Sequence, residues 1–101
     1  MYAGGLNGWH VMRYIELLIE YFAGAEAHDA MNTFDESYDN EAVTKAFEKF
    51  KEWVDKGYFP EGFVTLDAND TLMPLSSGEC AMTIEGQWQD SNIVKNELDM
   101  E

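Results

Sequence analysis

Residues 39–59 read DNEAVTKAFEKFKEWVDKGYF, and this stretch decides the fold class. Its apolar side chains recur at the three- and four-residue spacing of one helix face, at Val43, Ala46, Phe47, Phe50, Trp53 and Val54. Asp39 is predicted to cap the start of this helix. Gly57, as a left-handed residue after Lys56, is predicted to end it with Tyr58 packing back on Trp53. The stretch therefore predicts an amphipathic helix that buries one face.

The rest of the chain predicts more helices joined by short loops. A first helix is expected over residues 8–22, capped by Asn7, with a buried stripe of Val11, Ile15, Leu18, Ile19 and Phe22. Shorter helical pieces are expected over 25–31 and 67–77, with Asp67 or Asn69 as the cap of the second, and a last helix over 87–98. Residues 81–84 are the one convincing strand, and a lone strand needs a partner from another segment of a longer parent or from a second copy. The predicted fold class is mainly α with one or two short strands.

Composition excludes several classes of partner. The chain has 101 residues and carries 20 acidic against 6 basic side chains, a formal charge of −14, so nucleic acid and anionic membrane surfaces are not expected as partners. The apolar content of 46% argues against disorder. No stretch approaches the about 20 apolar residues that span a bilayer, and the chain does not open with a signal peptide. Because it opens on a glycine loop, we expect residues 1–101 to be a single subdomain of a larger protein.

Chemical motifs are weak. No nucleophile elbow or phosphate loop is present, and His10 and His28 lie too far apart to suggest a metal site, so we expect neither a metal nor a cofactor. Residues 67–70 begin like a calcium loop but lack its later Gly and Glu. Cys80 is interpreted as a small buried hydrophobe. Glu85 is the one acid beside a Trp at a strand end, which leaves open a general acid, a hydrogen-bond acceptor or a solvent-facing residue.

Two tryptophans differ from Trp53. Trp9 follows Gly8 directly and Trp88 lies two residues after Gly86, each at a junction between elements, and neither completes a helical stripe. A ring placed there stacks on a ligand or is an ordinary half-buried aromatic. Sugars pack their C–H faces on such rings while their hydroxyls seek amides and carboxylates, for which Asn7, Glu85 and Gln87 are candidates. We predict that Trp88 is partly exposed and separate from the stripe of Trp53.

Three motifs in order resemble a known family. They are Gly4-Gly5-x-Asn7-Gly8-Trp9 before a helix, the helix from Asp39 through Trp53-Val54-Asp55-Lys56-Gly57-Tyr58-Phe59, and Gly78-x-x-Ala81-Met82-x-x-x-Gly86-x-Trp88. From about Gly4 to the end, the chain resembles the extracellular solute-binding proteins of ABC transporters, and within them the family that carries sugars and oligosaccharides. Glu79 departs from the basic residue common at that point of the family.

The resemblance implies a two-lobed α/β protein that closes on its ligand, with this chain as a mostly helical part of the second lobe. Trp9, Gly86 and Trp88 would then face a sugar-binding cleft, with Asn7, Glu85 and Gln87 as neighbours and no catalysis. The resemblance further implies permease subunits as partners and an extracytoplasmic location, with a parent anchored as a lipoprotein. An isolated half of such a cleft is not expected to hold its ligand. Two other readings stay open, an acidic helical module that binds a basic protein and a fragment of a carbohydrate-active enzyme that uses Glu85 as its acid.

Overall fold

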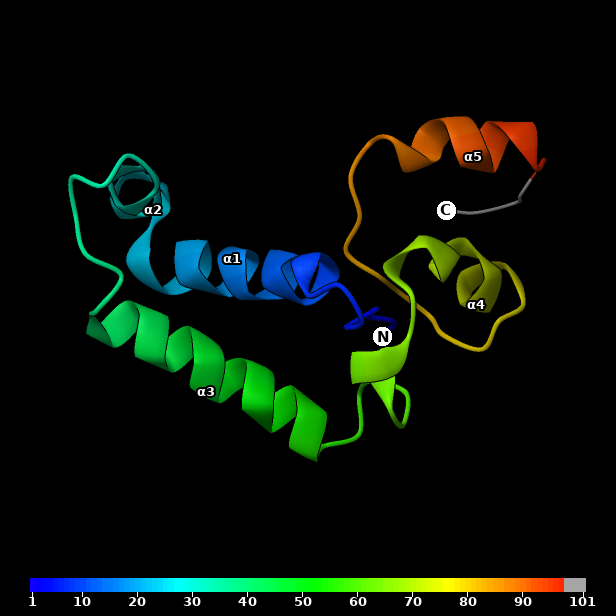
Figure 1. Cartoon of the computed structure of the whole chain (residues 1–101), viewed down its shortest axis with the longest axis horizontal. Helices are drawn as coiled ribbons and strands as arrows, with labels where there is room; N and C mark the ends of the chain where they lie inside the picture. The colour runs from blue at the N-terminus through cyan, green and yellow to red at the C-terminus, as the bar shows by residue number, and fades with distance from the viewer. Residues whose placement is uncertain (98–101) are drawn as a thin grey trace. The chain divides into compact units, whose positions relative to one another are not determined.

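The computed structural model describes residues 1–97 and divides them into two compact units. Unit 1 combines residues 1–11 with residues 59–97, and unit 2 holds residues 12–58. Helix α1, Trp9–Ala23, contributes its first three residues to unit 1 and the remainder to unit 2. The described chain is mainly helical, as predicted, and Figure 1 follows its helices from the N-terminus. The assignment to a second lobe stays a proposal.

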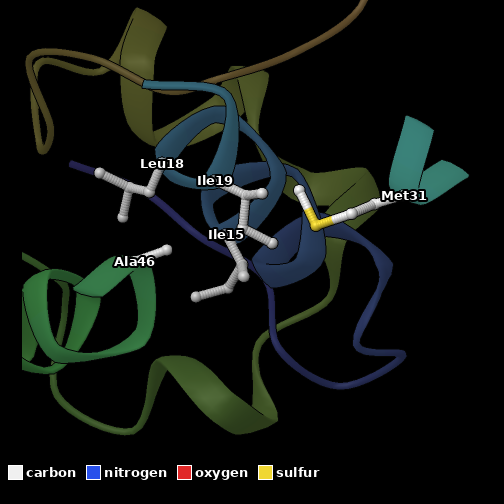
Figure 2. Packing of buried hydrophobic residues seen from close by; sticks show 5 residues of the cluster. All are labelled: Ile15, Leu18, Ile19, Met31 and Ala46. Carbon is white, nitrogen blue, oxygen red and sulfur yellow. The ribbon is translucent and has the colours of Figure 1, made fainter. Parts of the chain in front are cut away.

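Unit 2 is a small helical core. It contains most of α1, then α2, Ala25–Asn32, and α3, Glu41–Asp55. Figure 2 shows how the buried side chains from the three helices gather: Ile15, Leu18 and Ile19 of α1, Met31 of α2 and Ala46 of α3. Val43, Phe50 and Trp53 pack against this cluster from α3, which confirms most of the predicted stripe. The predicted burial of Phe47 is wrong, because this residue is 56% exposed.

The two ends of α3 show how the sequence sets its length. Asn40, not the predicted Asp39, is the N-cap, and its side-chain oxygen accepts a hydrogen bond from the Val43 N–H at 3.0 Å. At the other end Gly57 has a φ of +70° and its N–H donates to the Val54 carbonyl. The N–H of Tyr58 donates to the Trp53 carbonyl, and the two bonds form a Schellman motif, which confirms the predicted ending at Gly57. The packing of the Tyr58 side chain on Trp53 stays a prediction.

Unit 1 is built from short elements. Two 3₁₀ turns, η1, Phe63–Thr65, and η2, Ala68–Asp70, lead into α4, Leu72–Ser76, and the described chain closes with α5, Gln89–Lys95. The Asp67 side chain accepts from the Asn69 N–H and so caps η2 as expected of this residue. The last helix begins two residues later than predicted and is described to Lys95, while Leu98 lies outside the described residues.

The predicted strand at residues 81–84 is wrong. Within residues 1–97 the structure has no strand, and this segment makes one parallel bridge, between Thr83 and Tyr2. The bridge partner therefore comes from the N-terminus of the same chain. The pairing stops there because the next N–H groups are used elsewhere: that of Gly4 donates to the His10 ring and that of Gly5 to the Phe63 carbonyl. A second ladder position cannot form without breaking those bonds.

Candidate functional site

Trp9 and Trp88 meet in unit 1. Trp9 is the first residue of α1, and Trp88 is the N-cap residue of α5. Their ring centroids are 6.2 Å apart and the ring planes are inclined by 66°, an edge-to-face pair. Trp88 is 51% exposed and Trp9 is half-buried, so the predicted exposure of Trp88 is confirmed. Trp53 packs on the core of unit 2, as the sequence also predicted.

Gly86 gives room to a ring of the protein itself. A Cβ at position 86 would lie 2.0 Å from Cζ3 of Trp88 and 2.3 Å from its Cε3 and Cη2 atoms. Since carbon atoms in contact lie about 3.5 Å apart, any side chain here would displace the indole. One side of the Trp88 ring is therefore seated on the Gly86 backbone, and the edge-to-face contact with Trp9 fixes a second direction.

Glu85 is a buried carboxylate. Its side chain is 9% exposed. Oε1 accepts from the Thr71 hydroxyl at 2.9 Å and from the Gln89 amide at 3.4 Å, and Oε2 lies 3.3 Å from the Gly86 N–H. Thr71 is fully buried, and Gln89 is 9% exposed and takes a further bond from Asn92 at 2.8 Å. Glu85 is thus held by neutral donors beneath the segment that carries Trp88.

His10 joins the glycine loop to the same segment. Its ring is fully buried, and Nδ1 accepts from the Gly4 N–H at 3.0 Å. Nδ1 therefore carries no proton, and Nε2 is the N–H that donates to the Ile84 carbonyl at 2.8 Å. The Thr83 hydroxyl donates to the Tyr2 carbonyl and lies 3.3 Å from the same Nε2. His10 is a structural link between two segments that bear tryptophans.

Tyr2 extends this hydrogen-bond network from Thr83 to Asp67. The buried Tyr2 hydroxyl donates to the Asp67 carbonyl at 2.8 Å. Burial raises the pKa of the Tyr2 phenol, and the nearby Asp70 and Asp67 carboxylates raise it further. This hydroxyl therefore acts as a fixed donor, because deprotonation would place another negative charge among acids.

The remaining predicted residues lie at the surface. Asn7 and Gln87 are exposed, Asn7 two residues before Trp9 and Gln87 directly before Trp88, and neither makes a side-chain hydrogen bond among residues 1–97. The structure therefore brings Trp9, Gly86, Trp88 and Glu85 together in unit 1. It leaves the amides of Asn7 and Gln87 available to solvent.

Sequence reasoning missed most of the polar support. Thr71, Thr83 and Gln89 were not selected, and His10 was weighed only as a metal ligand. One local signal existed for Gln89, which lies four residues after Glu85 at the start of a predicted helix. Nothing local marks Thr71, which is 14 positions from its carboxylate partner. Among the described residues, no three His, Cys, Asp or Glu side chains gather as a metal site would require.

A separate apolar hollow of about 600 Å³ lies on unit 2. Leu17, Tyr21, Phe22 and Trp53 are among the residues that line it, and none of the six predicted site residues does. The hollow is thus a different surface from the Trp9–Trp88 pair.

Comparison with known proteins gives no match to a family model, a curated protein or a solved structure. Among residues 1–97, no helix combines the length and the apolar character needed to cross a membrane.

Proposed function

We propose that this chain takes part in non-covalent carbohydrate binding, as the part of an ABC-transporter solute-binding protein that supplies one wall of the ligand cleft. The observation that carries the proposal is the Trp9–Trp88 pair, in which a half-exposed indole is fixed by a second indole and by Gly86. A ring held in this way loses little conformational freedom when a ligand packs on it.

The chemistry of the pair fits a sugar. The exposed part of the Trp88 ring offers a flat apolar surface to the C–H face of a pyranose, and the indole N–H adds one hydrogen-bond donor. The exposed amides of Asn7 and Gln87 flank the two tryptophans in sequence and carry both donors and acceptors for hydroxyl groups. Trp9 acts mainly as the support that orients Trp88, since it is the more buried of the two.

The wider assignment follows from the motif resemblance. The whole protein would capture a sugar or oligosaccharide outside the cytoplasm, as a lipid-anchored lipoprotein, and deliver it to the permease subunits. No catalysis is proposed. The second lobe assignment of residues 1–101 belongs to the same proposal, because a stacking wall needs an opposite wall to enclose the ligand.

The test uses the indole signals of the full gene product. Single Trp→Phe variants assign the Trp9, Trp53 and Trp88 indole resonances, and a panel of neutral α- and β-linked glucose, xylose and mannose oligosaccharides is titrated. We expect saturable shifts at Trp9 and Trp88 with one of these sugars, and no shift at Trp53, which packs on the core of unit 2.

The matched variants are Trp88→Ala and Tyr21→Ala. Both remove a large exposed ring, since Tyr21 is 79% exposed, but Tyr21 belongs to unit 2. Trp88→Ala should abolish the response and Tyr21→Ala should leave it unchanged. The absence of any saturable shift at Trp9 or Trp88 across the panel would refute carbohydrate binding at this site.

A further inference from the structure

We infer that Glu85 is a positioning residue: its buried carboxylate fixes the segment of Gly86 to Gln89 and so sets the orientation of the Trp88 ring, without contacting a ligand. The consequence for ligand affinity rests on the proposed function. The consequence for the ring pair does not, because it is a property of the protein alone.

The carboxylate has little surface left for a ligand. The Glu85 side chain is 9% exposed, and its two oxygens are engaged by the Thr71 hydroxyl, the Gln89 amide and the Gly86 N–H. The Thr71 hydroxyl also accepts from the Gln89 amide at 3.2 Å, so three buried side chains form a closed triangle. Breaking one side of the triangle removes a hydrogen bond from two buried side chains, which disfavours a displaced carboxylate.

The Glu85 carboxylate contacts both ends of the segment from Gly86 to Gln89, which carries Trp88. At the first end the Gly86 N–H points to Glu85, and at the second end the Gln89 side chain reaches back to the same carboxylate. Between them, the Gln89 N–H donates to the Gly86 carbonyl at 3.0 Å and starts α5. Trp88 therefore lies in a turn that the Gln89–Gly86 backbone hydrogen bond closes. Hydrogen bonds to the Glu85 carboxylate hold both ends of this turn.

Hydrogen bonds also link the segment that carries Glu85 to the helix turn that carries Trp9. His10 follows Trp9 in α1 and donates through Nε2 to the carbonyl of Ile84, the residue before Glu85. Its Nε2 atom is also 4.0 Å from Glu85 Oε1. The backbone that carries Glu85 is thus tied to the first turn of α1, and a shift of the carboxylate changes the placement of Trp88 against Trp9.

The test replaces a partner of Glu85 that no ligand can reach. Thr71→Val keeps the shape of a fully buried side chain and removes its hydroxyl. Thr65→Val is the control, because its exposed hydroxyl makes only a local bond to the Gly62 carbonyl in the same unit. Both are compared with Glu85→Gln in the full gene product, by the indole resonances and by far-ultraviolet circular dichroism, in which a close pair of indoles gives a coupled signal.

Without ligand, we expect Thr71→Val and Glu85→Gln to shift the Trp88 and Trp9 resonances and to weaken the coupled signal, with the Trp53 resonance in place. With the oligosaccharide that the wild type binds, Thr71→Val should lower affinity by about tenfold. Thr65→Val should change none of these.

Two results would overturn the inference. One is an unchanged ring pair in Thr71→Val, and the other is a loss of affinity in Glu85→Gln with both rings unmoved, which would mark Glu85 as a ligand contact. If Thr71→Val fails to fold, shown by loss of the Trp53 resonance, Gln89→Met removes the two sides of the triangle that the Gln89 amide makes and is judged by the same criteria. If the wild type binds no sugar, the proposed function fails while the ring-pair measurements still decide the role of Glu85.

Discussion

Replacing Gly86 with Ala should move the Trp88 ring while leaving the fold nearly as stable as before. The added Cβ would lie 2.0 Å from Cζ3 of Trp88. Since carbon atoms in contact lie about 3.5 Å apart, the ring must retreat by about 1.5 Å. Trp88 is 51% exposed, so it can swing outward into solvent without disturbing the core.

The expected change in stability is small because two effects oppose each other. The φ of Gly86 is outside the left-handed region, so Ala fits the backbone and restricts the unfolded chain, a gain of about 0.4–1 kcal/mol. The displaced ring loses its edge-to-face contact with Trp9, a cost of about 0.5–1.5 kcal/mol. We therefore expect the free energy of unfolding to change by less than about 1 kcal/mol.

Gly78→Ala is the matched control in the same unit. Gly78 has a φ of +76°, and beyond its two chain neighbours no atom lies within 4 Å of the position that an added Cβ would take, so Ala is strained there but displaces nothing. It should cost about 1 kcal/mol or more in urea unfolding and leave the Trp88 indole resonance unchanged. Gly86→Ala should shift that resonance and abolish the coupled indole signal. A Gly86→Ala variant with an unmoved Trp88 resonance would refute the seating of the ring on Gly86.

Four other outcomes test the fold and the site. Ile19→Ala, at a side chain 4% exposed in the core of unit 2, should lower the free energy of unfolding by about 2–4 kcal/mol in urea titration, and a loss below about 1 kcal/mol would contradict that core. Asn40→Ala should cost about 1 kcal/mol in the same assay and Asp39→Ala much less, and the reverse order would restore Asp39 as the cap. Lys49 and Lys56 lower the pKa of Glu52 to about 2. These ion pairs therefore stabilise the fold fully above pH 4.5, and their contribution is lost as the pH falls toward 2. Carbon NMR of the Glu52 carboxyl should give a titration midpoint of about 2, and high salt should raise that midpoint. Residues 1–11 and 59–97 hold seven acids and one Lys or Arg, Lys95, so uronic-acid oligosaccharides should bind more weakly than neutral ones in competition titrations, and tighter binding of the acidic sugar would contradict this.

The sequence predicted the helices of unit 2 well because their information is local. A stripe such as Ile15, Leu18 and Ile19 fixes both the element and its buried face through spacing alone, and the ending at Gly57 follows from one residue type. Phe47 was misplaced because spacing defines an apolar face without saying how much of it the small unit can cover. Adjacent Asp39 and Asn40 are both good caps, and the sequence offers no way to choose between neighbours of equal propensity.

Unit 1 was less predictable because its structure rests on contacts between distant positions. Residues 81–84 have the composition of a strand, but hydrogen bonds of the glycine loop to His10 and Phe63 leave room for one bridge only. Thr71 and Glu85 meet through the fold, and Thr83 reaches Tyr2 across nearly the whole chain. No periodicity encodes such pairs.

The pattern Gly86-Gln87-Trp88 shows why a motif can identify a site and still mislead about its chemistry. In the sequence, Gly86 is interpreted as a residue that faces a ligand cleft beside a ring on which the ligand stacks, and a residue with no side chain would leave that ring accessible. In the structure the Trp88 ring itself occupies the space above Gly86, and the acid beside it faces inward to Thr71. A glycine before an aromatic residue therefore has two physical explanations, access for a ligand and seating of the ring. Seating of the ring on Gly86 also favours ligand binding. A ring that is fixed in place with half of its surface exposed is already in the orientation in which a sugar would pack on it.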